Sequence, residues 1–101
     1  MQSVRIAKYT ISNSTFQDIA DKAKKDLLPK LREQTGFIRY GVADMGDQYC
    51  ESISVWNTRE DAVASEAMTT TWVRENLEGK LQLKSSHVGT LAFDEGVRAT
   101  V

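Results

Sequence analysis

His87 is the only histidine of the chain, and histidine is the side chain whose ordinary pKa lies closest to neutral pH. In a pocket it could remove the proton of a phenol as a general base. The resulting phenolate is electron-rich and could pass an electron to molecular oxygen without a cofactor. A strand histidine at the surface or in an interface is the competing interpretation, because the sequence shows no partner for it. Arg39 could stabilise a developing anion, but solvent exposure or an intersubunit ion pair explains it equally.

Several aromatic side chains could line a pocket for a small, planar, hydrophobic ligand. Trp56 falls at the end of a predicted strand, where a pocket mouth and core packing are both plausible interpretations. Trp72 lies in the following predicted helix and fits core packing better. Tyr9 and Tyr40, on two predicted strands, could each orient a ligand oxygen or fill the core. Asn57 could donate to a ligand, although helix capping also accounts for it.

Other kinds of site find little support in the sequence. Cys50 has no basic neighbour to activate it as a nucleophile, and one cysteine with one distant histidine does not make a metal site. We therefore expect neither a metal nor a cofactor. Thirteen basic and 14 acidic residues lack the basic excess of a nucleic-acid-binding protein. The lone cysteine, the absence of a signal-peptide pattern and the lack of a long apolar run lead us to expect a cytoplasmic protein without a membrane span.

The elements that must position these residues follow from hydrophobic periodicity. We predict strands over residues 3–11, 37–43, 49–56 and 83–93. A first helix should begin near Phe16, capped by Ser14 with Gln17, and end before Gly36, with Pro29 disturbing its last turns. A second should begin after Asn57 or Thr58 and stop by residue 79, and residues 44–47 should form a hairpin turn.

This order predicts an α+β, ferredoxin-like split βαβ sandwich (βαββαβ), an antiparallel sheet with two helices on one face. We expect one domain over residues 1–93 and a C-terminal tail over residues 94–101. Since the third and fourth strands carry apolar groups on both faces, a second copy should cover the face without helices. The chain is therefore expected to form a homodimer through sheet-to-sheet packing, and its tail could cross to the partner subunit. The alternative is a monomer.

Two segments carry a resemblance to a known family: the Leu28-Pro29 and Leu31-Arg32-Glu33 run before Thr35-Gly36-Phe37, and Val55-Trp56-Asn57-Thr58-Arg59-Glu60-Asp61-Ala62. With them the chain, from the first strand to Phe93, resembles the antibiotic biosynthesis monooxygenase-like family of dimeric α+β barrels. The family includes cofactor-independent oxygenases of quinol-like aromatics, haem-degrading enzymes and members without assigned activity. The resemblance implies a cofactor-independent monooxygenase acting on a small hydrophobic aromatic compound. The alternative is a non-catalytic protein that binds a small ligand or acts as a dimeric scaffold.

Within that family, the haem-degrading branch requires an Asn on the first strand, a Trp in the second helix and a His ligand beyond it. The matching places hold Ala7 or Lys8, Ser65 and Glu75, so haem binding of that kind is not expected. Many members also carry a His in the first half of the second helix, where this chain has none. That departure favours the non-catalytic alternative.

Overall fold

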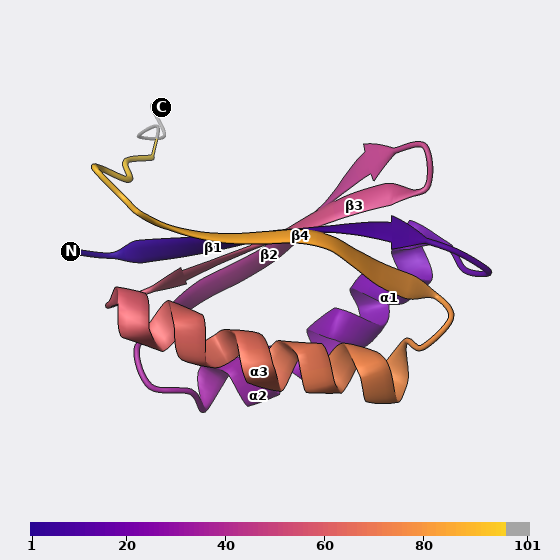
Figure 1. Cartoon of the computed structure of the whole chain (residues 1–101), viewed down its shortest axis with the longest axis horizontal. Helices are drawn as coiled ribbons and strands as arrows, with labels where there is room; N and C mark the ends of the chain where they lie inside the picture. The colour runs from indigo at the N-terminus through magenta and orange to yellow at the C-terminus, as the bar shows by residue number, and fades with distance from the viewer. Residues whose placement is uncertain (97–101) are drawn as a thin grey trace, which may run out of the picture.

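The structure, a computed structural model, describes residues 1–96 and consists of one antiparallel sheet with helices on one face (Figure 1). The sheet has the strand order β2-β3-β1-β4, and every neighbouring pair is antiparallel. The elements are β1 (Ser3–Ile11), α1 (Phe16–Lys22), the π-helical turn η1 (Ala23–Leu27), α2 (Leu28–Arg32), β2 (Phe37–Gly46), β3 (Tyr49–Trp56), α3 (Arg59–Asn76) and β4 (Leu81–Thr90). This confirms the predicted α+β, ferredoxin-like fold. None of the helices in residues 1–96 is long and apolar enough to cross a membrane.

Strand alternation gives the sheet two chemically different faces. On the helix-facing side, β1 and β3 present side chains that are all buried: Ser3, Arg5, Ala7, Tyr9, Ile11, Cys50, Ser52, Ser54 and Trp56. The opposite side, here called the open face, carries the alternate residues of the same two strands, Val4, Ile6, Lys8, Thr10, Tyr49, Glu51, Ile53 and Val55. The core therefore lies between the sheet and the helices, and the open face has no element of secondary structure over it (Figure 1).

The first helical region begins one residue later than the predicted capping box. Thr15, rather than Ser14, is the N-cap residue, because its hydroxyl accepts a hydrogen bond from the backbone N–H of Asp18 at 3.1 Å. Gln17 instead donates to Asp21 on the same helix. The predicted apolar stripe is confirmed where it is deepest, since Ile19, Ala23, Leu27 and Leu31 are almost completely buried.

Pro29 divides the first helical region into α1, η1 and α2. A proline has no N–H with which to continue the α-helical hydrogen-bond ladder. Just before it, the N–H of Leu28 donates to the carbonyl of Ala23, five residues back, which is the π-helical pattern. Pro29 then occupies the first turn of α2, where a missing donor costs little. The predicted disturbance at Pro29 is thus a wide turn within one continuous helical path.

The bounds of two strands differ from the predicted ones, whereas α3 stops before residue 79 as expected. Strand β2 continues to Gly46, and the β2–β3 turn lies at Asp47 and Gln48, both with positive φ angles, instead of over residues 44–47. Strand β4 begins two residues earlier and ends three residues earlier than predicted. Helix α3 ends at Asn76, ahead of Gly79, whose φ angle is +78°.

The two segments that carry the family resemblance meet at one corner of the fold. Gly36 precedes β2 with a φ angle of +77°, and a Cβ atom placed on it would lie 2.0 Å from the Asp61 carboxylate at the start of α3. The Asn57 N–H donates to the Gly36 carbonyl at 2.8 Å. Thr58 caps α3 by accepting from the Asp61 N–H at 3.1 Å. This corner therefore needs a glycine for both its backbone angle and its space.

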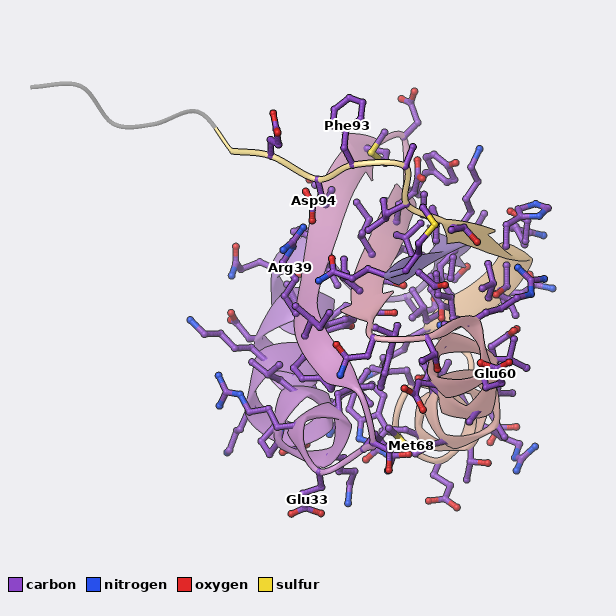
Figure 2. All side chains as sticks on the ribbon, turned by 90° about the vertical axis from the view of Figure 1, so that its left-hand side faces the viewer. Glu33, Arg39, Glu60, Met68, Phe93 and Asp94 are labelled. Carbon is purple, nitrogen blue, oxygen red and sulfur yellow. The ribbon has the colours of Figure 1, made fainter. Side chains whose placement is uncertain are left out.

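After β4 the chain turns back over the open face. The Leu91 N–H donates to the Gln2 carbonyl at 2.9 Å, and Asp94 forms an ion pair with Arg39 on the far edge strand, as Figure 2 shows. Arg39 pairs with Val55 in the register of the sheet, and Val55 is only 3% exposed although it lies on the open face. Most of the predicted tail, residues 97–101, lies outside the described residues.

We predict that Gly36→Ala is the most destabilising alanine substitution among three glycines. A left-handed φ angle costs an ordinary residue about 1–3 kcal/mol, and at Gly36 the overlap with Asp61 adds to it. Gly46→Ala should show the cost of the angle alone, because nothing lies within 4 Å of its added Cβ, and Gly41→Ala should be nearly neutral. Urea unfolding of the three variants measures their free energies of unfolding and hence the order of destabilisation. Equal effects at Gly36 and Gly46 would contradict the steric part of the argument.

Candidate functional site

A small apolar cavity lies between the helix-facing side of the sheet and the helices. It encloses about 20 Å³ of free space, which is room for about one water molecule. Four aromatic residues line it, namely Tyr9, Phe16, Tyr40 and Trp72, and its polar wall consists of Cys50, Ser52 and Thr69. The remaining wall is mainly aliphatic. The composition is that of a site for an apolar, planar molecule, although the side chains almost fill the space.

An open groove adjoins this cavity at the β2 edge of the sheet. The groove has a volume of about 340 Å³ and runs between β2 and the α1–η1 segment. Ala23, Tyr40 and Val42 line both the groove and the cavity. Tyr40 is the largest of the three residues common to both spaces.

Two ionisable groups of the cavity wall, Tyr40 and Cys50, are kept uncharged by their surroundings. Burial, together with the nearby Tyr9 and Cys50, raises the pKa of the Tyr40 hydroxyl far above its ordinary value. Burial also raises the pKa of the Cys50 thiol, with help from Asp44 and Glu51. Tyr40 is therefore a permanent hydrogen-bond donor, and Cys50 is a poor nucleophile, as predicted.

Glu51 is the only acidic residue among the described residues that line the cavity. It pairs with Lys8 across β1 and β3, on the open face. Its carboxylate therefore points away from the cavity, which consequently has no side chain suited to act as a general base.

Arg5 is a functional candidate that the sequence reasoning missed. It lies on the helix-facing side of β1, paired with Ser54 of β3 and Val88 of β4, and is only 4% exposed. Its Nε donates to the Ser86 hydroxyl at 3.1 Å, and that hydroxyl donates to the Glu66 carboxylate, also at 3.1 Å. In the sequence, a single arginine among the hydrophobic residues of β1 resembles any surface arginine. Only the burial seen in the structure marks Arg5 as unusual.

The two tryptophans have different surroundings. Trp72 reaches the cavity from α3. Trp56 is completely buried and does not line the cavity. Its indole N–H donates to the Ser54 hydroxyl at 2.8 Å, and its ring meets Phe37 edge to face with centroids 5.4 Å apart. The structure thus brings Tyr9, Tyr40 and Trp72 together and keeps Trp56 in the core beside them.

The polar candidates lie elsewhere. His87 is exposed and pairs with Ile6, which places it on the open face, on the other side of the sheet from the cavity. Arg39 is on the same face, in its ion pair with Asp94 (Figure 2). Asn57 is exposed in the turn before α3. Within residues 1–96, no three His, Cys, Asp or Glu side chains gather closely enough to hold a metal ion.

Comparison with known proteins finds similarity in structure and none in sequence. Neither a protein-family model nor a curated protein sequence matches the chain. A variant of SnoaB, a cofactor-independent oxygenase from Streptomyces nogalater, superposes with a TM-score of 0.71 at 12% identity, over 92% of this chain and 95% of SnoaB.

Two further structures come from Nitrosomonas europaea. One is provisionally assigned as an antibiotic biosynthesis monooxygenase (TM-score 0.70, 17% identity, 94% of each chain). The other is a protein of unknown function (TM-score 0.70, 11% identity, 96% of each chain). At such low identity the likeness concerns the fold. The chain therefore has the ferredoxin-like α+β fold of the antibiotic biosynthesis monooxygenase-like proteins, in agreement with the resemblance seen in its sequence.

Proposed function

We propose that this protein binds a small aromatic molecule in the cavity between its sheet and its helices. The observation that carries the proposal is the grouping of Tyr9, Phe16, Tyr40 and Trp72 around one apolar space. Flat rings stack favourably on such side chains. The Tyr40 hydroxyl supplies a donor that could orient an oxygen of the ligand.

Entry of the ligand requires the wall to move, because about 20 Å³ does not accommodate an aromatic ring. In this proposal Tyr40 swings aside and the cavity merges with the adjoining groove. The groove is already open to solvent and large enough for a bicyclic compound. The bound ligand then occupies the joined space between β2 and η1.

Cofactor-independent oxygenation is our second candidate function, supported by the common fold with SnoaB, itself such an enzyme. In this reaction an ionised phenol or quinol passes an electron to oxygen. The predicted base, His87, lies on the open face. Our hypothesis that His87 is catalytic therefore requires a substrate on that face, whereas a reaction in the cavity would have to generate the phenolate in another way.

We also propose that the protein works as a homodimer whose subunits pack through their open faces. Ile6 and Ile53 lie opposite each other on the two central strands and are 36% and 44% exposed. Val4 and Val55 form the next row of the same face. An apolar strip at the centre of a sheet would be covered by a second copy. Such packing would also enclose His87.

We expect Ala23→Leu to abolish binding of 1-naphthol and 1,4-naphthohydroquinone, since the larger side chain fills the place where cavity and groove meet. Overpacking should cost about 1–3 kcal/mol of stability. Isothermal titration calorimetry measures the binding, and the melting temperature reports the fold. Ala64→Leu, on the exposed surface of α3, is the matched control and should bind like the wild type. Unchanged binding by a folded Ala23→Leu variant would exclude this cavity as the site.

The oxygenase hypothesis predicts oxygen consumption above the spontaneous rate when the same naphthohydroquinone is added. An oxygen electrode measures it, in the wild type and in His87→Ala. A loss of at least a hundredfold in the variant is expected if His87 is the base. Full activity in His87→Ala would show that another group acts as the base. Binding of the compound without any oxygen consumption would refute the oxygenase hypothesis and leave only the binding function.

The dimer proposal predicts that Ile53→Lys halves the mass in solution, because a charged side chain would be buried at the centre of the interface. Light scattering after gel filtration measures the mass. Val63→Lys is the control, since Val63 is 46% exposed on α3, away from the open face. A monomeric wild type at tens of micromolar would contradict the proposal.

A further inference from the structure

The charge of Arg5 is incompletely compensated by the protein. Its guanidinium is almost entirely buried, and the nearest carboxylate among the described residues, that of Glu66, lies 3.9 Å from Nε. Glu66 has a side chain that is 38% exposed, so water shares its charge. A buried cation normally has a close, well-formed anionic partner, because removal from water is costly. Arg5 is thus short of negative charge on the inner side of the fold.

Arg5 does not line the cavity itself, but it lies one row of the sheet away from residues that do. The sheet register places Arg5, Ser54 and Tyr40 in one row across β1, β3 and β2. The next row on the same side contains Ala7, Ser52 and Val42, and both Ser52 and Val42 line the cavity. Tyr40 belongs to the Arg5 row and lines the cavity as well. A ligand that displaces the Tyr40 ring would therefore extend towards the guanidinium.

Several polar groups lie near Arg5, although its neighbour on β4, Val88, is apolar. Ser54 and Trp56 form a hydrogen-bonded pair on β3, and Ser86 is held by Arg5 from β4. The titratable and charged groups of the elements around Arg5 are Glu66 from α3, Tyr40 from β2, and Arg59, which donates to the Val88 carbonyl beside Arg5. Tyr9 and Cys50 lie on the same side of the sheet, two rows away. The positive charge of Arg5 acts on the Tyr40 hydroxyl, where it lowers the pKa against the larger opposing effect of burial.

We infer that Arg5 binds an ionised oxygen of the ligand. The ligands of the cavity are then aromatic compounds that carry an acidic hydroxyl group and bind as phenolates. This inference rests on the proposed cavity function. A phenolate oxygen near the guanidinium would receive a charge-assisted hydrogen bond. Binding itself would then promote loss of the phenolic proton to the solvent, without a dedicated base in the cavity. Arg5 is a ligand-binding residue in this account, and Ser86 with Glu66 positions it.

The experiment measures the pKa of 1-naphthol bound to the full chain, from the long-wavelength absorption of its anion during a pH titration. An opposite charge within a few ångströms lowers the pKa of an acid by about 1–3 units, and we expect a shift of this size. By linkage, at a pH above the pKa of free 1-naphthol its affinity should exceed that of 1-methoxynaphthalene, which cannot ionise, by about tenfold for each unit of the shift.

Arg5→Gln should abolish both the shift and the preference, whereas Arg5→Lys should retain part of each. Arg32→Gln, which neutralises an exposed arginine on α2, is the matched control and should leave both unchanged. The melting temperature of each variant reports its folding, and the comparison of the two ligands in the wild type requires no substitution at all.

The outcomes distinguish a failure of the role of Arg5 from a failure of the proposed ligand binding in the cavity. If neither naphthalene compound binds to the wild type, the cavity function itself fails. If both bind with equal affinity and the bound pKa equals the free one, binding stands and the role of Arg5 is refuted. If a folded Arg5→Gln variant keeps the full shift, another group stabilises the anion and the assignment to Arg5 is wrong.

Discussion

The alternation of side chains along β1 and β3 determines which residues of this protein can act together. Because successive residues point to opposite faces, Arg5 and Tyr9 share the inner side with Ser54 and Cys50, while Ile6 and Ile53 share the open face. The edge strands follow the same division, with Tyr40 inside and His87 outside. No rearrangement of side chains can bring a residue across the sheet. The cavity wall therefore offers hydroxyl groups and a neutral thiol, with Arg5 one row away on the same side of the sheet.

This division has an energetic consequence for the interior. The row that crosses β1, β3 and β2 at Arg5 is polar, and a buried polar row contributes less apolar burial than an aliphatic one. Its groups are stabilised by hydrogen bonds among themselves, from Trp56 to Ser54 and from Arg5 through Ser86 to Glu66. Such an arrangement is a cost to stability that a purely structural core would avoid. The same polar row supplies the groups on which the proposed binding of a phenolate depends.

Local sequence patterns were sufficient for the fold but insufficient for the site. Strands β1 and β3 were predicted with their correct bounds because β-branched and aromatic residues cluster there between turn residues. The end of β2 was missed because Asp47 and Gln48 adopt positive φ angles without being glycines. Arg5 was missed because its burial depends on Glu66 and Ser86, which lie far away in the chain. The surroundings of Trp56 and Trp72 likewise depend on long-range packing, which periodicity does not encode.

The π-helical turn η1 keeps the apolar stripe of the first helical region in phase. From Phe16 to Leu31 the chain advances 15 residues, which in a regular α-helix would leave the last side chain rotated by about 60° from the first, at about 100° per residue. The wider turn between Ala23 and Leu28 absorbs this angular drift. The wider turn thus restores the direction of the apolar side chains, so that Leu31 is again buried against the rest of the core. Ala23, at which the wider turn begins, lines the groove beside β2 with its small side chain, so the segment that completes the core also forms the inner edge of the groove.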